Sequence, residues 1–314
     1  MILVLMILGL IILVKGADLF VDGSASIARR LLIPNIIIGL TLVAFGTSAP
    51  EAAVSIKASI DGANGIALGN VVGSNLFNLM FILGITAIIK PVSIHVNSLK
   101  KELPFMLLVT LMILFLAFEG NGDLVFSRYD GFVMLLMFGM YLYSMLAIMK
   151  KDDQNIEIDY KEVSLFKSIG LSALGILMII LGADWTVKGA VWMAELFGVS
   201  DLIIGLTIIA AGTSLPELVT SIVAAKKGES DIAIGNIIGS NIFNILFVLG
   251  ASSTVEPINL TKDGVMDMVI LLGVSVFGFI LMFTGKSVNR KEGITLMLLY
   301  IIYILYRLIS AGAF

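Results

Sequence analysis

The stretch Gly-Leu-Thr-Leu-Val-Ala-Phe-Gly-Thr-Ser-Ala-Pro-Glu, residues 39–51, recurs as Gly-Leu-Thr-Ile-Ile-Ala-Ala-Gly-Thr-Ser-Leu-Pro-Glu at 205–217. A second motif, Gly-Asn-Val-Val-Gly-Ser-Asn-Leu-Phe-Asn at 69–78, returns as Gly-Asn-Ile-Ile-Gly-Ser-Asn-Ile-Phe-Asn at 235–244. Both second copies lie 166 residues after the first, and from 38 to 51 the copies agree at 10 of 14 positions. One offset shared by two separate motifs indicates an internal duplication of the chain.

The composition of the chain is that of a membrane protein. Of its 314 residues, 59% are hydrophobic and 14% are charged, and the mean hydropathy is +1.06. Soluble domains have about 45–50% apolar and about 25% charged residues, so we expect lipid around most of the surface. The chain contains no cysteine, which excludes a disulfide framework, a thiolate metal site and a cysteine nucleophile. It also has no basic domain with which it could bind nucleic acid.

Ten apolar segments are long enough to cross a hydrocarbon core of ~30 Å, which takes about 20 helical residues. The first lacks a basic n-region and a small-residue cleavage site, so we expect a retained helix rather than a signal peptide. The sequence therefore predicts an all-α membrane protein with ten transmembrane helices. The predicted spans lie near 1–25, 33–57, 66–89, 103–119, 129–149, 165–192, 200–225, 231–254, 266–284 and 293–312.

Five of these spans fall in each half of the chain. Residues 1–149 are predicted to form a first five-helix repeat with motifs at 39–84, and residues 165–314 a second with motifs at 205–250. The charged segment 150–164 is predicted to be a short cytoplasmic linker. Because each repeat has an odd number of spans, the second must enter the membrane with opposite polarity. That is the inverted-repeat architecture of secondary transporters, whose binding site lies at the midplane.

The distribution of basic residues predicts the orientation of the chain. If the N-terminus lies outside, 14 of the 20 Lys and Arg residues fall in cytoplasmic loops. Cytoplasmic loops of membrane proteins carry the excess of these residues. We therefore expect both the N-terminus and the C-terminus to lie outside.

The repeated motifs place oxygen-bearing groups inside apolar spans. Pro50 and Pro216 each remove an amide donor and clash with the preceding helical turn, so we expect freed carbonyl oxygens around Ala44 and Ala210. The second motif adds side chains four residues apart, which share one helix face. Carbonyls, hydroxyls and carboxylates are ligands for calcium, magnesium or sodium rather than zinc or copper. The side chains that offer such oxygens are Thr47, Ser48, Glu51, Ser74 and Asn78, and Thr213, Ser214, Glu217, Ser240 and Asn244.

Glu51 and Glu217 decide between a binding site and a packing surface. A carboxylate at the bilayer centre costs roughly 2.5–3.5 kcal/mol on insertion scales, and neither glutamate has a Lys or Arg three or four residues away. Two such costs at equivalent positions indicate a bound cation that is not part of the protein. By contrast, the glycines and serines of the second motif, taken alone, are typical of close helix packing.

The other charged groups near the spans have simpler interpretations. Lys15 lies three residues before Asp18, and Lys188 lies four residues after Asp184. These spacings allow a local ion pair on one helix face, so a structural role is favoured over a place along the ion entrance. His95 falls in a predicted inner loop, where we expect it to be solvated.

The two motifs, Gly-Thr-Ser-x-Pro-Glu and Gly-Asn-x-x-Gly-Ser-Asn-x-Phe-Asn, resemble the alpha repeats of the calcium/cation antiporter superfamily, specifically its sodium/calcium exchanger branch. The resemblance covers the whole chain. It implies that the second, third, seventh and eighth spans hold the ions, while the first and sixth slide to alternate access. The ligands that it implies are the Ala44 and Ala210 carbonyls with Thr47, Ser48, Glu51, Ser74, Asn78, Thr213, Ser214, Glu217, Ser240 and Asn244.

Two features depart from other branches of that superfamily. Proton/calcium exchangers carry an acidic residue shortly after the Gly-Asn pair, where this chain has Gly73 and Gly239. Potassium-dependent members, and some prokaryotic sodium/calcium exchangers, carry aspartate where this chain has Asn244. The resemblance therefore argues against coupling to protons and against potassium as a co-substrate.

The predicted function is a secondary active antiporter of the cell membrane that exchanges sodium for calcium by alternating access. We expect electrogenic, potassium-independent transport in which the sodium gradient drives calcium out. The predicted partners are the two ions and membrane lipid, with no cofactor and no obligatory protein partner. The alternatives left open are potassium-dependent exchange, a cation channel, and proton-coupled or magnesium-linked exchange, because two close carboxylates can hold protons. An enzyme is disfavoured because the spans show neither a Ser/His pair nor an aspartyl dyad.

Overall fold

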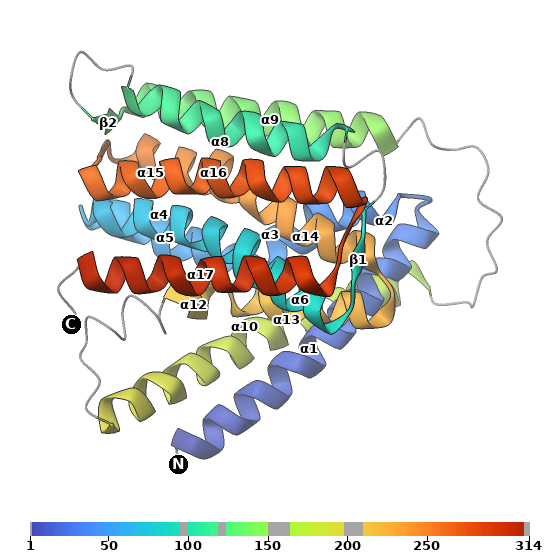
Figure 1. Ribbon diagram of the computed structural model, residues 1–314. Helices are drawn as coiled ribbons and strands as arrows, with labels where there is room; N and C mark the ends of the chain where they lie inside the picture. The colour runs from blue at the N-terminus through green and yellow to red at the C-terminus, as the bar shows by residue number, and fades with distance from the viewer. Residues whose placement is uncertain (1, 95–99, 119–123, 150–163, 198–209, 311–314) are drawn as a thin grey trace.

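The computed structural model describes residues 2–94, 100–118, 124–149, 164–197 and 210–310, and this part of the chain is almost entirely helical (Figure 1). The first half contains α1 (Ile2–Arg30), α2 (Asn35–Ile38), the π-helix η1 (Gly39–Val43), α3 (Ala44–Thr47), α4 (Ala49–Ile60), α5 (Asn64–Leu76), the π-helix η2 (Phe77–Ile82), α6 (Leu83–Ile89), β1 (Val92–Ser93), α8 (Glu102–Phe118), β2 (Val125–Phe126) and α9 (Arg128–Met149). The second half contains α10 (Leu165–Leu196), α12 (Ala210–Thr213), α13 (Leu215–Lys227), α14 (Ser230–Phe243), the π-helix η4 (Asn244–Leu249), α15 (Gly250–Val255), β3 (Ile258–Asn259), α16 (Lys262–Gly285), β4 (Ser287–Val288) and α17 (Arg290–Ser310).

The same order of elements occurs in both halves. α4 begins at Ala49 and α13 at Leu215, and β1 begins at Val92 and β3 at Ile258, so each pair starts 166 residues apart. Two short antiparallel sheets then join the halves, because β1 pairs with β4 and β2 pairs with β3. Figure 1 shows β1 and β2 near opposite ends of the helices. At each end of the molecule, one short sheet therefore pairs a strand of the first half with a strand of the second half.

Seven of the described helices are long and apolar enough to cross a membrane, and the bent pair 35–60 makes an eighth. α8 is also apolar but has only 17 residues. The predicted span 200–225 is described only from residue 210, so the count of ten spans stays a prediction. The chain is therefore a multi-pass, nearly all-helical membrane protein. The seven helices are Ile2–Arg30, Gly65–Ile89, Arg128–Ala147, Leu165–Leu196, Ser230–Val255, Lys262–Gly285 and Arg290–Ser310.

The predicted span 33–57 is not one continuous helix. It consists of Asn35–Thr47 and Ala49–Ile60, which meet at an angle of 50°. Ser48 separates them with φ −84° and ψ 9°, and Pro50 follows in the first turn of α4, where its missing amide costs no hydrogen bond. The break therefore lies just before the proline, and the helix axis changes direction there by 50°.

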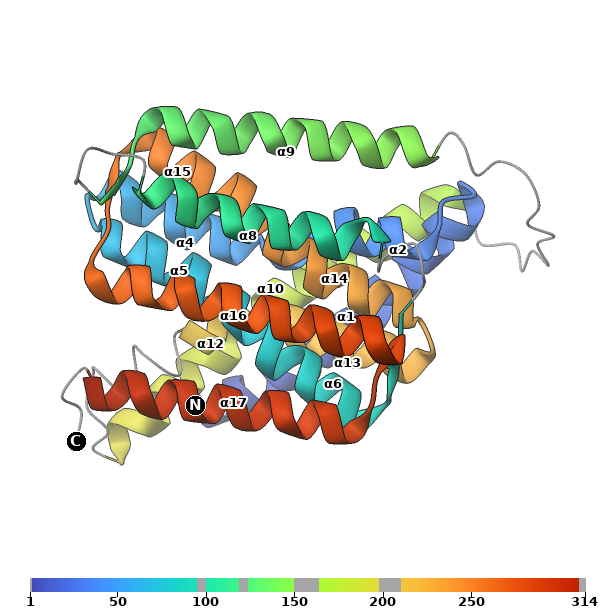
Figure 2. The same ribbon diagram turned by 45° about the horizontal axis from the view of Figure 1, so that its top comes forward.

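The helices α1 and α10 cross antiparallel at close range along a stripe of small residues. A Cβ atom on Gly9 would lie 2.9 Å from the Gly182 carbonyl oxygen, and one on Gly16 would lie 2.8 Å from that of Gly175. A Cβ on Gly23 would lie 2.9 Å from the Ser168 carbonyl oxygen. Small residues at such positions let helix backbones approach within lipid. In Figure 1 this pair runs obliquely to the other long helices, which Figure 2 shows nearly parallel to one another.

The centre of the molecule is formed by the helices that carry the second motif. Every residue of α14 from Ile232 to Phe243 is buried, so other helices surround it on all sides. π-Helical turns are rare and occur often at functional sites. Here η2 and η4 begin at Phe77 and Asn244, so each includes the last asparagine of a motif. The motifs thus lie in the interior, beside local irregularities of the backbone.

Candidate cation site

Two breaks between helices position a pair of buried carboxylates. Ser48 separates α3 from α4 and Ser214 separates α12 from α13, each with ψ 9°. Glu51 and Glu217 follow in the first turns of α4 and α13, and their exposed fractions are 0% and 1%. The backbone N–H groups at a helix N-terminus stabilise negative charge. Both breaks therefore place a carboxylate where its charge is partly compensated.

Hydrogen bonds between the two halves bring these carboxylates together. The Ser48 hydroxyl donates to Glu217 Oε1 over 2.6 Å, and the Ser214 hydroxyl donates to Glu51 Oε1 over 2.8 Å. Each serine of one half thus holds the glutamate of the other. The second motif completes the arrangement, since the hydroxyl oxygens of Ser48 and Ser240 lie 2.9 Å apart and those of Ser214 and Ser74 lie 3.1 Å apart.

Four buried oxygens of the predicted ligands have no hydrogen-bond partner among the described residues. They are Oε2 of Glu51 and Glu217 and Oδ1 of Asn78 and Asn244. Buried polar atoms are almost always paired, and an unpaired buried carboxylate oxygen is costly. A cation coordinated by these oxygens would remove that cost. The unpaired atoms therefore fit an ion site better than a packing surface.

The chemistry of the site indicates which cations fit. Within the described residues, no ion pair joins Glu51 or Glu217 to a basic side chain, and no group of three or more His, Cys, Asp or Glu side chains is placed to hold a metal ion. The donors are two carboxylates with hydroxyls and amide carbonyls. This all-oxygen set suits alkali and alkaline-earth cations rather than transition metals.

Two asparagines hold the backbone beside the glutamates, and sequence reasoning did not assign them to the site. Asn70 Nδ2 donates to the Glu51 carbonyl over 3.2 Å and to Ser55 Oγ over 2.9 Å. Asn236 makes the equivalent bonds to the Glu217 carbonyl over 3.3 Å and to a serine hydroxyl over 2.9 Å. Their presence at the same place in both motif copies was the available signal. Its meaning depends on contacts between helices, which a sequence does not show.

The predicted threonine ligands turn toward these asparagines. Thr47 Oγ1 lies 3.0 Å from Asn236 Oδ1, and Thr213 Oγ1 lies 3.4 Å from Asn70 Oδ1. Both hydroxyls therefore connect the break in one half to the asparagine of the other. A role of the two threonines as direct ligands stays a prediction.

The expected release of the Ala44 carbonyl is wrong. Its oxygen accepts the Ser48 N–H over 3.0 Å. The reason is the hydrogen-bond spacing of a helix: an amide at position 50 would bond to Gly46, four residues earlier, so Pro50 affects Gly46 rather than Ala44. The Thr47 hydroxyl also lies within hydrogen-bond distance of the Ala44 oxygen, at 3.4 Å. Ala210 is the first described residue of α12.

Asn78 and Asn244 differ in their surroundings although they are equivalent in sequence. Asn244 Nδ2 donates to Asn75 Oδ1 over 3.2 Å, and Asn75 Nδ2 donates to the Asn241 carbonyl over 3.2 Å. Both polar atoms of the Asn78 amide lack a partner in the described part of the chain. The site is thus symmetric in its carboxylates and serines but not in its amides.

Comparison with known proteins identifies the family of the chain. A sequence model of the family described as "Sodium/calcium exchanger protein" matches residues 1–147 and 167–309. The chain belongs to the sodium/calcium exchanger family. Like other members, this exchanger is a cation/calcium antiporter of the membrane.

Relatives and solved structures match this exchanger over nearly its full length. It is 34% identical to the sodium/calcium exchanger MaX1 of Methanosarcina acetivorans, and 39% identical to the putative antiporter CaxA of Alkalimonas amylolytica, over 96% of each chain. The structure of the sodium-calcium exchanger NCX_Mj soaked with sodium and strontium is similar, with a TM-score of 0.84 at 35% identity over 97% of each chain.

Several charged residues outside the exchanger's site form ion pairs, though not all as expected. Lys188 Nζ lies 2.8 Å from Asp184 Oδ2, which confirms that local ion pair. The partner of Asp18 is Lys227 at 3.5 Å rather than Lys15, and Lys227 also lies 2.8 Å from Asp22. The prediction considered partners on the same helix only, whereas α13 supplies this one. His95 lies outside the described residues.

We expect Asn70→Ala and Asn236→Ala each to weaken calcium binding by the exchanger about tenfold. Each change removes two hydrogen bonds that hold the turn carrying a glutamate, and leaving buried groups unpaired costs about 1–3 kcal/mol. The measurement is the calcium concentration that half-saturates transport in proteoliposomes. Asn259→Ala, at an exposed position in β3, is the control. Unchanged half-saturation in both site variants would contradict the positioning role.

Proposed function

We propose that this exchanger carries calcium and sodium in opposite directions through one shared site at Glu51 and Glu217. The observation that supports this most directly is the pair of buried carboxylates, each with one oxygen held by a serine of the other half and one oxygen without a partner. Two negative charges match one calcium ion, and the shared oxygens can be redistributed among sodium ions. The empty, doubly negative site is too costly to carry across the membrane, so exchange is obligatory.

The oxygen inventory is sufficient for calcium. Calcium takes six to eight oxygen ligands. The unpaired oxygens of Glu51, Glu217, Asn78 and Asn244 provide four, and the second carboxylate oxygens would complete the minimum if both glutamates bind in bidentate fashion. The hydroxyls and backbone carbonyls then provide smaller pockets for sodium. The proposed ligands are those named from the sequence: Ala44, Thr47, Ser48, Glu51, Ser74, Asn78, Ala210, Thr213, Ser214, Glu217, Ser240 and Asn244.

The proposed topology is ten transmembrane helices in two inverted five-helix repeats, 1–149 and 165–314, with both termini outside. Its support is the arrangement of the elements. In Figure 1, α1 begins and α17 ends on the left, whereas α9 ends on the right. The antiparallel contact of α1 with α10, and the exchanged pairing of the short strands, fit a two-fold axis in the membrane plane. Alternating access would follow from movement of α1 and α10 against the remaining helices.

The experiment that tests this function is calcium uptake into proteoliposomes under an outward sodium gradient. Uptake that depends on internal sodium supports the exchanger. Equal uptake under outward potassium or proton gradients would instead indicate another coupling ion. Calcium flux without any counter-ion on the opposite side would indicate a channel.

We expect transport to be electrogenic and independent of potassium. Within the proposed site only Glu51 and Glu217 are ionised, so one calcium neutralises it, whereas more than two sodium ions leave it positive. A turnover then moves net charge and responds to voltage by about 2.3 kcal/mol per charge per 100 mV. The measurement is sodium-driven calcium flux at voltages set with an ionophore other than valinomycin, with and without potassium on both sides. A rate that ignores voltage contradicts the two-charge site.

The variant Asn244→Asp sharpens this prediction. A third carboxylate beside two glutamates would attract an additional cation or hold a proton, so calcium exchange should become sensitive to potassium or to pH. Asn289→Asp, which adds the same charge at an exposed position, is the control. If Asn244→Asp transports like the unchanged protein under every condition, Asn244 does not contact the ions.

A further inference from the structure

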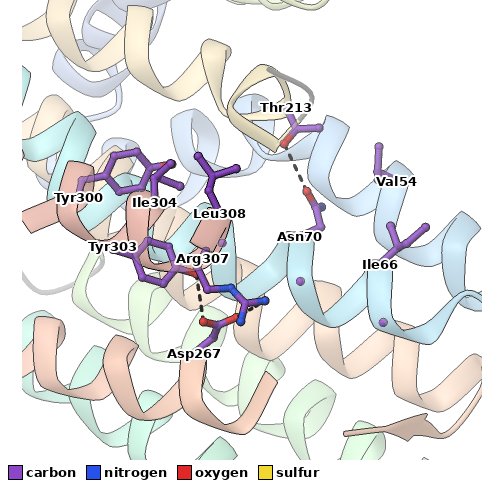
Figure 3. A pocket seen from close by; sticks show the side chains of 13 residues that line it. Val54, Ile66, Asn70, Thr213, Asp267, Tyr300, Tyr303, Ile304, Arg307 and Leu308 are labelled. Atoms are coloured by element: carbon purple, nitrogen blue, oxygen red, sulfur yellow. Dashed lines mark hydrogen bonds and ion pairs between the residues drawn. The ribbon is translucent and has the colours of Figure 1, made fainter. Parts of the chain in front are cut away.

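A cavity of about 360 Å³ lies beside the candidate cation site, and Figure 3 shows it from close by. Asn70 on α5 and Thr213 on α12 lie on one wall, and Asp267 on α16 and Arg307 on α17 lie on the other. Since Asn70 also donates to the Glu51 carbonyl over 3.2 Å, the wall of the cavity is one hydrogen bond away from the ion-binding turn. The cavity therefore lies directly beside the site, where ions can approach it.

The charged wall of this cavity is a small, connected cluster. Tyr303 donates its hydroxyl to Asp267 Oδ1 over 3.2 Å, and Arg307 Nη2 lies 3.5 Å from Asp267 Oδ2. The side chain of Asp267 is only 12% exposed and that of Arg307 is 24% exposed. Arg307 also reaches Asp263, whose side chain is 74% exposed, over 3.8 Å. Asp267 and Arg307 are the charged side chains among the residues that line the cavity.

The first half of the chain has a counterpart of this carboxylate and tyrosine. α9 and α17 begin at Arg128 and Arg290, 162 residues apart, so Tyr141 corresponds to Tyr303. α8 and α16 share one pattern of buried positions, 165 residues apart, in which Glu102 corresponds to Asp267. The pattern consists of Glu102, Leu103, Met106, Thr110, Ile113 and Ala117 in α8, and of Asp267, Met268, Leu271, Ser275, Gly278 and Met282 in α16.

Glu102 and Tyr141, the counterparts of Asp267 and Tyr303, are buried. Glu102 is 6% exposed, and its Oε2 has no hydrogen-bond partner within the described ranges. The Tyr141 hydroxyl lies 3.5 Å from the Leu40 carbonyl oxygen, so this tyrosine contacts the bent span. A Cβ on Gly239 would lie 2.7 Å from that same Leu40 oxygen. On the Glu102 side, protein atoms therefore occupy the position that corresponds to the cavity.

The equivalent glycine on the other side is Gly73, which lines the cavity. The nearby Ile66 is 59% exposed, whereas its counterpart Ile232 is fully buried. Within the described residues, the two halves therefore differ: a cavity lies beside Asp267, whereas Glu102 is enclosed.

We propose that Asp267 and Glu102 are entrance carboxylates, which concentrate cations at the two approaches to the ion site in turn. This inference rests on the proposed antiport. In the described state Asp267 acts on ions in the open cavity, while Glu102 is shut away with an unpaired oxygen. When the opposite side opens, Glu102 lines the approach there and Asp267 becomes enclosed.

The physical basis of the proposal is electrostatic focusing. Charges in a cleft with low-dielectric walls raise the local concentration of counter-ions. Arg307 opposes Asp267 in the open cavity, whereas Met145 stands at the corresponding position of α9. The two approaches therefore differ in charge, and Arg307 reduces the attraction of cations on the Asp267 side.

The test uses two variants of opposite sign in the same cluster. Asp267→Asn leaves Arg307 as the charge of the cavity wall, and Arg307→Met leaves Asp267 and copies the residue of the first half. Asp267→Asn should raise, and Arg307→Met should lower, the half-saturating concentrations of both ions from the cavity side. At the dielectric constant of water, a unit charge about 10 Å away changes the local concentration of sodium about twofold, and that of calcium, with twice the charge, about fourfold.

A comparison of the sodium and calcium shifts separates electrostatic attraction from structural damage. A local potential acts on each ion in proportion to its charge, so the calcium change must equal the square of the sodium change. Both changes should also shrink as ionic strength rises, because salt screens exposed charges. A distorted site would show neither relation, and it would shift both variants in the same direction.

Thiol labelling assigns the side of each approach. Because the chain contains no cysteine, Ile66→Cys should react with a membrane-impermeant thiol reagent from the cavity side, and Ile232→Cys should not. Glu102→Gln should then raise the half-saturating calcium concentration only from the opposite side.

The outcomes distinguish this inference from the proposed function. If the unchanged protein shows no counter-ion-dependent flux, the antiport itself is wrong. If it exchanges ions normally, but Asp267→Asn and Arg307→Met leave both half-saturating concentrations unchanged, the entrance carboxylates are wrong and the antiport stands. Shifts of opposite sign with the squared relation establish the role of Asp267. An effect of Glu102→Gln from the cavity side would overturn the assignment of Glu102.

Discussion

Replacing Glu51 or Glu217 by Gln should abolish calcium exchange in a protein that still folds. Each carboxylate provides half of the charge that compensates a dehydrated divalent cation, and both side chains are buried away from bulk solvent. At low effective dielectric, the loss of one unit charge near the ion costs several kcal/mol. We therefore expect calcium flux to fall by at least about a hundredfold, at 1.4 kcal/mol for each factor of ten. The measurement is sodium-driven calcium uptake in proteoliposomes.

Three observations would control this result. Glu195→Gln, at an exposed position near the end of α10, should transport normally, and all variants should elute as monodisperse protein of the same size. The two glutamates should be damaged to nearly the same extent, because Ser214 and Ser48 hold them in equivalent ways. Substantial calcium flux in either variant would exclude that glutamate as an essential ligand.

A second large effect is expected from one added methyl group. Gly239→Ala should lower the melting temperature in detergent, whereas Gly73→Ala, its counterpart in the other half, should leave it unchanged or raise it slightly. The new Cβ at Gly239 would lie 2.7 Å from the Leu40 carbonyl oxygen and 2.8 Å from the Ala44 Cβ, so backbone must shift. Overpacking of this kind costs about 1–3 kcal/mol. At Gly73 no described atom lies within 4 Å.

This pair of variants is internally matched, since the same substitution is made at the same place in each motif. A helix-propensity effect would stabilise both variants alike, because alanine is favoured over glycine in helices by about 1 kcal/mol. Only the difference in packing separates them. Equal melting temperatures would show that the two sides have the same packing in solution, which would contradict the described asymmetry.

The structure brings together side chains that the duplication marks twice in the sequence. The pairing of Ser48 with Glu217 and of Ser214 with Glu51 unites side chains that both motif copies contained. Their assignment as ion ligands stays a prediction. What the pattern could not show was the partner of each group, since these contacts join residues more than 160 positions apart.

The features that the sequence missed depend on contacts between helices or on backbone detail. Asp18 pairs with Lys227 on α13, and helical spacing can only suggest partners on the same helix. The π-turns η1, η2 and η4 have no signal of their own in composition. The proline of the first motif predicted a disturbed helix but not the break at Ser48, because the direction of the chain after a break is set by what it packs against.

The glycine stripe between α1 and α10 sets a length scale for any relative motion of these helices. Its contacts repeat every seven residues on both partners, with Gly9, Gly16 and Gly23 opposite Gly182, Gly175 and Ser168. Seven helical residues rise about 10.5 Å, so the interface regains its own pattern only after a shift of that size. Any smaller shift sets glycines against larger side chains and forces the backbones apart. The spacing of the stripe therefore favours a few discrete relative positions of α1 and α10 over a continuous range of positions.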